Sequence, residues 1–267
     1  MADALFRPEG DVWIPHALTR GPWSPLALHG GPVAALLART AERVPTPGPM
    51  HPARLTVELL RPVPLAPLRA TASVLRPGRK VQWVTASLHA GDVEVARATL
   101  LRIRTAAVPW SETVAGGPMT LAFPGPDPAG RVAPSFTAQD APGYHNQATE
   151  HRVVRGSWTE LGPIVDWIRL RRPLVPDETP SPLQRVAAVA DFGNGVSAAL
   201  PYDRYQFINP DLTIALHRLP ATEWVCLEAA TYPERHGTAT AESVLWDEQG
   251  RLGYAVQTVL LEARGAD

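Results

Sequence analysis

The sequence predicts an α+β fold of two similar halves, in which each half has one helix and a set of antiparallel strands. Several runs alternate between apolar and polar side chains and are joined by short polar turns, which is typical of a half-buried antiparallel sheet. A stretch with helical periodicity occurs in each half. The same order of elements, with a tight hairpin before a long last strand, occurs twice, so we expect duplication of one folding unit.

The first half is expected to consist of a helix followed by strands. Gly30, Gly31 and Pro32 open an Ala- and Leu-rich helix over residues 33–43, and Pro45 ends it. Strands are expected over residues 51–60, 68–76, 81–89 and 93–104. Short polar turns join several of them, so neighbouring strands should pair as hairpins.

The second half repeats this plan. Ser181 and Pro182 are residue types preferred at the N-cap and at the first helical position, and the helix that they open runs to Asp191. Strands are expected over residues 144–155, 164–171, 205–216, 224–232, 237–246 and 252–263.

Composition shifts divide the chain into two units and a connection. We place the N-terminal unit at residues 1–107, which begins with a polar lead-in over residues 1–22 and a short strand near Trp13. The C-terminal unit covers residues 141–267. Residues 108–140 are rich in proline and glycine and lack lasting periodicity, so we interpret them as a linker.

The composition indicates an ordinary globular protein. Of 267 residues, 45% are hydrophobic, and 25 basic residues nearly balance 26 acidic ones, which gives a net charge of −1. This balance gives no reason to expect a nucleic-acid partner or a membrane surface. The single cysteine, Cys226, and the absence of a secretory signal pattern favour a cytoplasmic location. The eight histidines are scattered and no cysteine pair exists, so no metal is expected.

Two polar residues interrupt apolar patterns in the second half. Asp191 ends the helix, where its charge opposes the helix dipole, and Gln257 lies inside the apolar last strand. A buried polar side chain costs free energy unless it is hydrogen-bonded. We therefore expect these two residues to bind each other or a substrate.

Five short motifs, in this order, resemble those of a known family. They are His29-Gly30-Gly31 before the first helix, Leu75–Arg79 before a long strand, Asp191 in VADFGNG, Asn209–Arg218 in NPDLTIALHR, and Gln257 in AVQTVL. Together they span roughly residues 10–264 and resemble the TesB-like (thioesterase II) acyl-CoA thioesterases. The resemblance implies a tandem, or double, hotdog fold, in which each half wraps an antiparallel sheet around a long central helix.

The resemblance also implies an active site. In that family an aspartate, a threonine or serine, and a glutamine orient one water, and Asp191 and Gln257 fall on the first and third positions. The middle position falls on Asn209, which has no hydroxyl group. Thr213 offers a hydroxyl four residues later, on the same face of the predicted strand. Either Asn209 or Thr213 is therefore expected to complete the catalytic group.

The substrate implied by the resemblance is an acyl-CoA, hydrolysed to a free acid and CoA without a cofactor. Arg76 and Arg79 are candidates to bind the CoA phosphates, because a guanidinium group binds phosphate in a bidentate manner. Gly30 and Gly31 are candidates to line the substrate site at the helix start, where close packing is the simpler role. Exposed sheet edges favour a homodimer or higher homo-oligomer.

Two alternatives stay open at this point. A non-catalytic acyl-CoA-binding or scaffold protein would explain why Asn209 replaces the hydroxyl residue of the family. A hotdog acyl-CoA hydratase would use an aspartate–histidine pair, and we find no such neighbour for His29, which is interpreted as a loop histidine. Release of free CoA from acyl-CoA would distinguish the thioesterase from both.

Overall fold

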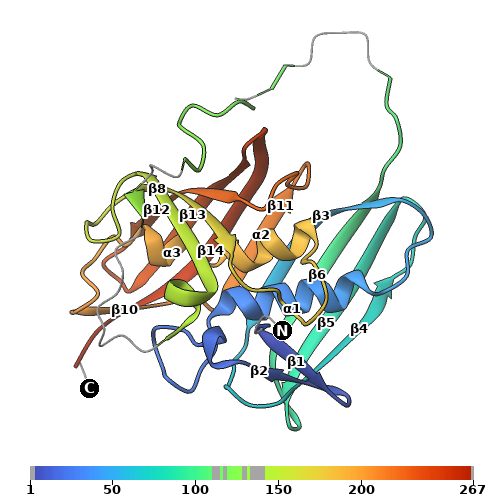
Figure 1. The fold of residues 1–267 in the computed structure, drawn as a ribbon, viewed down its shortest axis with the longest axis horizontal. Coiled ribbons are helices and arrows are strands. Elements are labelled where there is room, and N and C mark those ends of the chain that lie inside the picture. Colours follow the sequence, from blue (N-terminus) through green and yellow to red (C-terminus); the bar gives the residue numbers. More distant parts are fainter. Residues whose placement is uncertain (1–3, 110–114, 117–118, 128–130, 133–141, 266–267) are drawn as a thin grey trace.

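The structure is a computed structural model, which describes residues 4–109, 115–116, 119–127, 131–132 and 142–265. In these residues, one sheet of fourteen strands carries two long helices side by side on the same face (Figure 1). Every pair of neighbouring strands among the described residues is antiparallel. In the described part of the chain, no helix is both long and apolar enough to cross a membrane.

The first half contains one helix and six strands. In chain order they are β1 (Phe6–Glu9), β2 (Val12–Pro15), α1 (Gly30–Glu42), β3 (Met50–Leu59), β4 (Leu68–Arg76), β5 (Val81–Ala90) and β6 (Val93–Arg104). A short 3₁₀ turn, Ala17–Thr19, lies between β2 and α1.

The second half contains two helices and the remaining strands. In chain order they are β7 (Arg131–Val132), β8 (Thr149–Arg155), β9 (Ile164–Leu170), α2 (Pro182–Ala190), α3 (Gly193–Val196), β10 (Tyr205–Ile208), β11 (Asp211–Leu216), β12 (Val225–Pro233), β13 (Thr238–Asp247) and β14 (Gly250–Ala263). A single π-helical turn, Tyr144–Ala148, precedes β8.

The strand order confirms the predicted duplication. The first half has the order β1-β2-β4-β5-β6-β3, and the second has the matching order β8-β9-β12-β13-β14-β11. The two inner strands, β3 and β11, pair with each other and join the halves into one sheet, with Thr56 opposite Thr213. Among these six matched strands, each half places its long helix between the second and the third in the chain, which are β2 and β3 in the first half and β9 and β11 in the second. The double hotdog predicted from the sequence is confirmed.

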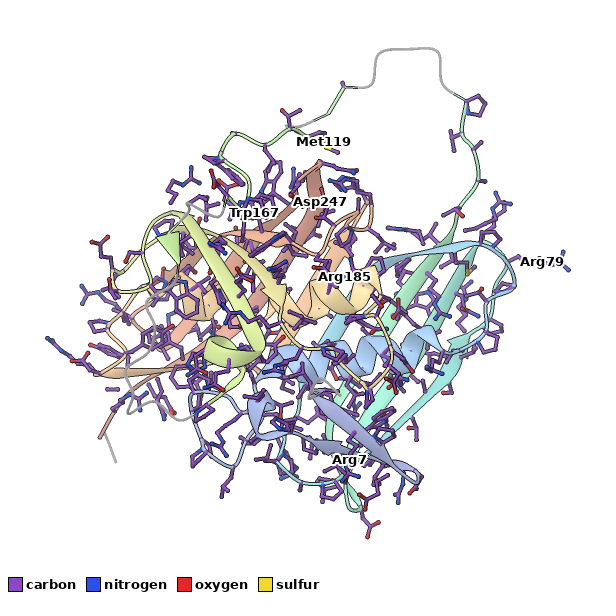
Figure 2. All side chains as sticks on the ribbon, in the orientation of Figure 1. Arg7, Arg79, Met119, Trp167, Arg185 and Asp247 are labelled. Carbon is purple, nitrogen blue, oxygen red and sulfur yellow. The ribbon has the colours of Figure 1, made fainter. Side chains whose placement is uncertain are left out.

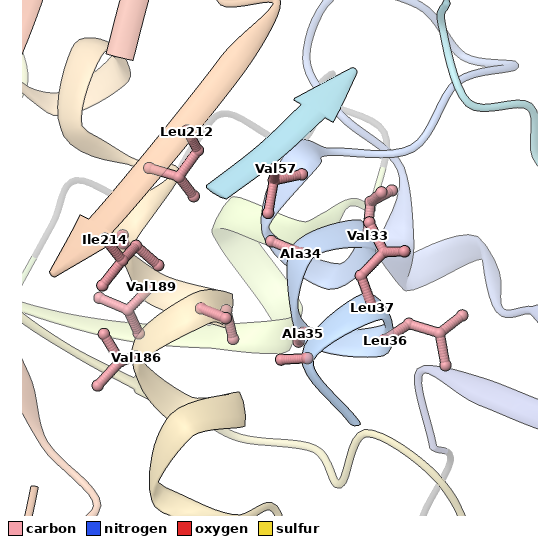
Figure 3. Close-up of a cluster of buried hydrophobic side chains, with 14 of the residues drawn as sticks. Val33, Ala34, Ala35, Leu36, Leu37, Val57, Val186, Val189, Leu212 and Ile214 are labelled. Carbon is pink, nitrogen blue, oxygen red and sulfur yellow. The ribbon is translucent and has the colours of Figure 1, made fainter. Parts of the chain in front are cut away.

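The two long helices pack against each other in antiparallel orientation. At one end, a Cβ atom on Gly31 would lie only 2.5 Å from the Ala188 carbonyl oxygen of α2. At the other end, Glu42 of α1 accepts hydrogen bonds of 2.7 Å from Ser181 and Gln184. Small and branched apolar side chains from both helices and both inner strands fill the space between them (Figure 3). The hydrophobic core is therefore continuous across the two halves.

The structure corrects three details of the predicted elements. Residues 144–148 form a π-helical turn rather than the start of a strand. The predicted strand over residues 205–216 is two strands, because Pro210 has no N–H group to donate and the chain turns at Asn209. Strand β1 lies within the segment interpreted as a polar lead-in, and Phe6 at its start is fully buried.

The predicted linker lies partly outside the described residues. Among its residues 108–140, the ranges 110–114, 117–118, 128–130 and 133–140 are not described, so the domain boundaries stay a prediction. Residues 131–132 form β7, which pairs with β8.

A buried carboxylate holds the last hairpin of the second half. Asp247 is fully buried, and it accepts hydrogen bonds from Arg218 (Nη1 at 2.8 Å) and from the backbone N–H groups of Ala221 and Gln249, both at 2.9 Å. Burial alone would raise the pKa of Asp247, but these hydrogen bonds and the Arg218 charge outweigh it, so the pKa is lowered.

We predict that this carboxylate makes stability depend on pH. Because its pKa is lower in the folded state, Asp247 stabilises the fold above the ordinary carboxyl range, and the contribution is lost as the pH falls through its folded pKa. Asp247→Asn should lower the free energy of unfolding at neutral pH by about 1–3 kcal/mol and flatten its decline in acid. Urea unfolding at several pH values measures both, with Asp92→Asn in the exposed β5–β6 turn as control. An unchanged acid slope would contradict the prediction.

Candidate active site

Asp191 lies where the two halves meet. It is the C-cap residue of α2, only 5% exposed, and antiparallel packing brings it to the N-terminus of α1. A Cβ atom on Gly30 would lie 2.6 and 2.7 Å from the two carboxylate oxygens. The C-terminus of a helix is unfavourable for a negative charge and the N-terminus is favourable. The charge that opposes the dipole of α2 is therefore complemented by the dipole of α1.

Two side-chain amides hold the Oδ1 atom of Asp191. Asn209 donates from Nδ2 at 2.8 Å, and Gln257 donates from Nε2 at 3.3 Å and also to the Asp191 backbone carbonyl at 3.2 Å. The orientation of the Gln257 amide is fixed, since its Oε1 accepts the backbone N–H of Asn194 at 3.0 Å. Gln257 is only 1% exposed, so it holds the carboxylate and has little contact with solvent.

A histidine from the first half contacts the Oδ2 atom. His29 Nδ1 lies 2.9 Å from Asp191 Oδ2 and also 3.0 Å from the Gly31 backbone nitrogen, as the N-cap of α1. One ring nitrogen cannot donate to the carboxylate and accept from Gly31 at the same time. The hydrogen bond that the geometry forms is the one from the Gly31 N–H group to Nδ1, so the proton of the neutral ring lies on Nε2.

Aromatic rings enclose this contact. The His29 ring centroid lies 4.7 Å from that of Phe192 and 5.0 Å from that of Tyr144. The Tyr144 hydroxyl donates to the Ala188 carbonyl at 2.8 Å. Burial first, and then the negative charge of Asp191, raise the pKa of Tyr144 well above its usual range, so this phenol stays neutral at physiological pH.

Family comparison identifies the chain. Residues 19–103 match the model of the acyl-CoA thioesterase N-terminal domain, and residues 121–261 match that of the C-terminal domain. The chain belongs to the acyl-CoA thioesterase family. The TesB-like resemblance is thereby confirmed, and the protein is a thioester hydrolase.

Solved structures share the fold of this thioesterase over nearly its whole length. A hotdog protein of unknown function from Alicyclobacillus acidocaldarius superposes with a TM-score of 0.71 at 22% identity, covering 97% of this chain and 96% of that one. A putative thioesterase II from Thermobifida fusca gives 0.70 at 17%, covering 96% and 94%. The acyl-CoA thioesterase II TesB2 of Mycobacterium marinum gives 0.67 at 18%, covering 97% and 96%. No curated protein matches the chain.

Among the predicted catalytic residues, the structure brings Asp191, Gln257 and Asn209 together but not Thr213. Thr213 contacts Thr56 across β3 and β11, with 3.4 Å between the hydroxyl oxygens. Its neighbours on either side in β11 point into the core, so Thr213 faces the other side of the sheet. The prediction that Asn209 and Thr213 share one strand face is wrong, because the strand breaks between them.

The predicted substrate-binding residues lie in two places. Gly30 and Gly31 lie at the site and allow α1 to approach Asp191 and α2, as close packing requires. Arg76 and Arg79 lie around the β4–β5 turn. Gln82, just after this turn, donates a hydrogen bond to the carbonyl of Pro45, which follows the C-terminus of α1. The two arginines are therefore near the end of α1 that is opposite to Gly30. Figure 2 shows Arg79 on the opposite side of the molecule from α3, which follows Asp191 in the chain. A role of these arginines in CoA binding stays a prediction.

The contact between His29 and Asp191 is the feature that sequence reasoning missed. The interpretation of His29 as a loop histidine without an acidic neighbour is wrong. The two residues are far apart in the sequence, and their contact depends on how the halves pack. The only local sign was an N-cap position filled by a histidine rather than by serine, threonine, aspartate or asparagine.

A second buried histidine lies beyond Phe192. His151 Nδ1 is 2.8 Å from Asp166 Oδ2, and its Nε2 is 3.0 Å from Thr149 Oγ1. This order resembles a nucleophile–histidine–aspartate triad, but all three side chains are nearly inaccessible and no substrate can reach the hydroxyl. We assign the group a structural role. Within the described ranges, no cluster of three or more histidine, cysteine, aspartate or glutamate residues could hold a metal ion.

We predict that Gly30→Ala impairs catalysis while the fold is retained. The new Cβ would lie within 2.7 Å of both carboxylate oxygens and would displace Asp191 from its partners. Displacement of a catalytic group by about 1 Å can cost up to roughly 100-fold in rate. The measurement is kcat for acyl-CoA hydrolysis, with circular dichroism to show that the fold is retained. Gly48→Ala is the matched control, since nothing lies within 4 Å of its Cβ position. Equal kcat values for parent and Gly30→Ala would contradict the prediction.

Proposed function

We propose that this thioesterase hydrolyses acyl-CoA to free acid and CoA with a water molecule that Asp191 deprotonates. The single observation that carries the proposal is the buried carboxylate, which two amides hold at Oδ1 by hydrogen bonds and which His29 contacts at Oδ2. Thioester hydrolysis needs a base that reaches a water and donors for the oxyanion that develops on the carbonyl oxygen. The surroundings of Asp191 supply both requirements.

Asn209 is suited to orient the water. Its Nδ2 donates to Asp191, and no described residue donates to its Oδ1 atom. Oδ1 can therefore accept one hydrogen of a water whose other hydrogen points at the carboxylate. An amide oxygen does here what the oxygen of a hydroxyl side chain could do. The absence of a hydroxyl at Asn209 is then no argument for a non-catalytic scaffold.

The N-terminus of α1 is suited to stabilise the oxyanion. The first N–H groups of a helix have no partner within the helix, and the positive end of the dipole favours a negative charge there. Gly30 is the first residue of α1 and packs against the Asp191 carboxylate. A thioester carbonyl that approaches the water would thus meet the Gly30 N–H group without any side-chain donor.

A hydratase is the second candidate. The observation that favours it is the contact of 2.9 Å between His29 and Asp191, since an aspartate–histidine pair can also add water to a double bond conjugated with a thioester. An enoyl-CoA substrate separates the two activities. A thioesterase releases a free thiol from it, whereas a hydratase removes the enoyl absorbance and leaves the thioester intact.

We predict that Asp191→Asn abolishes thiol release from a panel of acyl-CoA substrates, with a loss of about 100-fold or more, since the base is removed. Asn209→Leu should lower kcat strongly, because it removes the amide beside Asp191. Thr213→Val is the matched control and should keep parental activity, since Thr213 faces the other side of the sheet. Thiol release is followed with a chromogenic disulfide. Full activity of Asp191→Asn, or a parent inactive on every chain length, would refute the proposal.

A further inference from the structure

We propose that His29 is a catalytic residue which protonates the departing thiolate of CoA and is recharged with a proton by Asp191. This inference rests on the proposed hydrolysis of acyl-CoA. The observation behind it is that His29 bridges the buried carboxylate and the outside of the site. Its Nδ1 lies 2.9 Å from Asp191 Oδ2, and its side chain keeps 11% of its surface exposed.

The inner end of the ring is fixed. Phe192 and Tyr144 pack on the imidazole with centroid distances of 4.7 and 5.0 Å, so the ring has little freedom to rotate away from Asp191. Among the described residues, Asp191 is the acidic side chain within ion-pair distance of His29. Tyr144 is neutral, and the pair of His151 and Asp166 lies on the other side of Phe192.

The outer end of the ring is free to react. No described residue forms a hydrogen bond with His29 Nε2, and this nitrogen is not among the buried side-chain atoms without a partner, so it reaches solvent. The carboxylate itself is enclosed by Asn209, Gln257 and the Gly30 backbone. The Nε2–H group of His29 is therefore the proton donor that the leaving sulfur can reach, whereas the enclosed Asp191 side chain is not.

A comparison of the N-cap residues of α1 and α2 indicates that His29 has a chemical role besides capping. The second half caps its long helix with Ser181, whose hydroxyl accepts the Gln184 N–H at 3.2 Å. The first half uses His29 at the same position of α1. Capping alone does not require an imidazole, since asparagine and serine are better N-caps. The imidazole adds a second nitrogen that carries a proton out of the buried site.

The water oxygen forms a bond to the carbonyl carbon, and the water proton passes to Asp191 Oδ2. The carbon–sulfur bond breaks, its electron pair leaves with sulfur, and the sulfur takes the proton from His29 Nε2. In the same step Asp191 Oδ2 passes its proton to His29 Nδ1, so the ring stays neutral and becomes the other tautomer. A tautomer exchange through solvent at the exposed Nε2 restores the starting state, and no further reactant is required.

The test compares two leaving groups on the same acyl chain. The thiolate of CoA benefits from protonation, whereas a thiolate of thiophenol is stable enough to leave without a proton. His29→Asn retains an N-cap oxygen and a donor toward Asp191 but has no group in the place of Nε2. We expect it to lose about 100-fold in kcat/KM on acyl-CoA and less than about fivefold on the aryl thioester. Asp191→Asn should lose activity on both substrates.

The control is His16→Asn, the same substitution at the histidine that caps the 3₁₀ turn, and it should match the parent on both substrates. His29→Gln is the second variant, should His29→Asn unfold. An equal loss on both leaving groups would overturn the proposal and leave His29 as a positioning residue only. Parental activity of the His29 variants on acyl-CoA would also overturn it. A parent that releases no CoA from any substrate, yet is folded, would refute the proposed function itself.

Discussion

The antiparallel packing of α1 on α2 is the constraint on which the site depends. It sets the C-cap of one helix against the N-terminus of the other, and this approach is possible because Gly30 and Gly31 have no Cβ atom at the point of contact. Asp191 then has a helix dipole of favourable sign directly beside it. At the other end of the helix pair, Glu42 of α1 accepts hydrogen bonds from Ser181 and Gln184 of the α2 N-terminus, and these bonds fix the register of the two helices. The carboxylate is therefore positioned by the hydrophobic core as a whole, and not by a loop.

Duplication supplied two equivalent halves, and the site arises from their differences. Thr56 pairs with both Thr99 and Thr213, and Thr213 pairs with Val256, so Leu100 in β6 is the counterpart of Gln257 in β14. The first half keeps an apolar side chain there and contributes to the core. It contributes to the site through the N-terminus of its helix and through His29. Neither half alone contains the complete arrangement around Asp191.

Much of this architecture could be predicted from the sequence because its patterns are local. Strand periodicity, the opening of α2 at Ser181 and the repeated order of elements do not depend on how the halves pack. Asp191 and Gln257 were detectable because each is a polar residue in an apolar pattern, and both lie in the site. The break at Asn209-Pro210 and the resulting orientation of Thr213 required the strand register. The contact of His29 with Asp191 joins residues on different halves, so no local pattern could reveal it.

As the proposed base, Asp191 acts on a water molecule, and neighbouring side chains already contact both of its carboxylate oxygens. A single turnover with enzyme in excess, carried out in water labelled with heavy oxygen, tests this most directly. Mass spectrometry of the products should find the label in the released acid from the first turnover, with none in the peptide that contains Asp191. Unlabelled acid together with label in the Asp191 carboxylate would instead mean that this residue attacks the thioester itself, and would contradict the account.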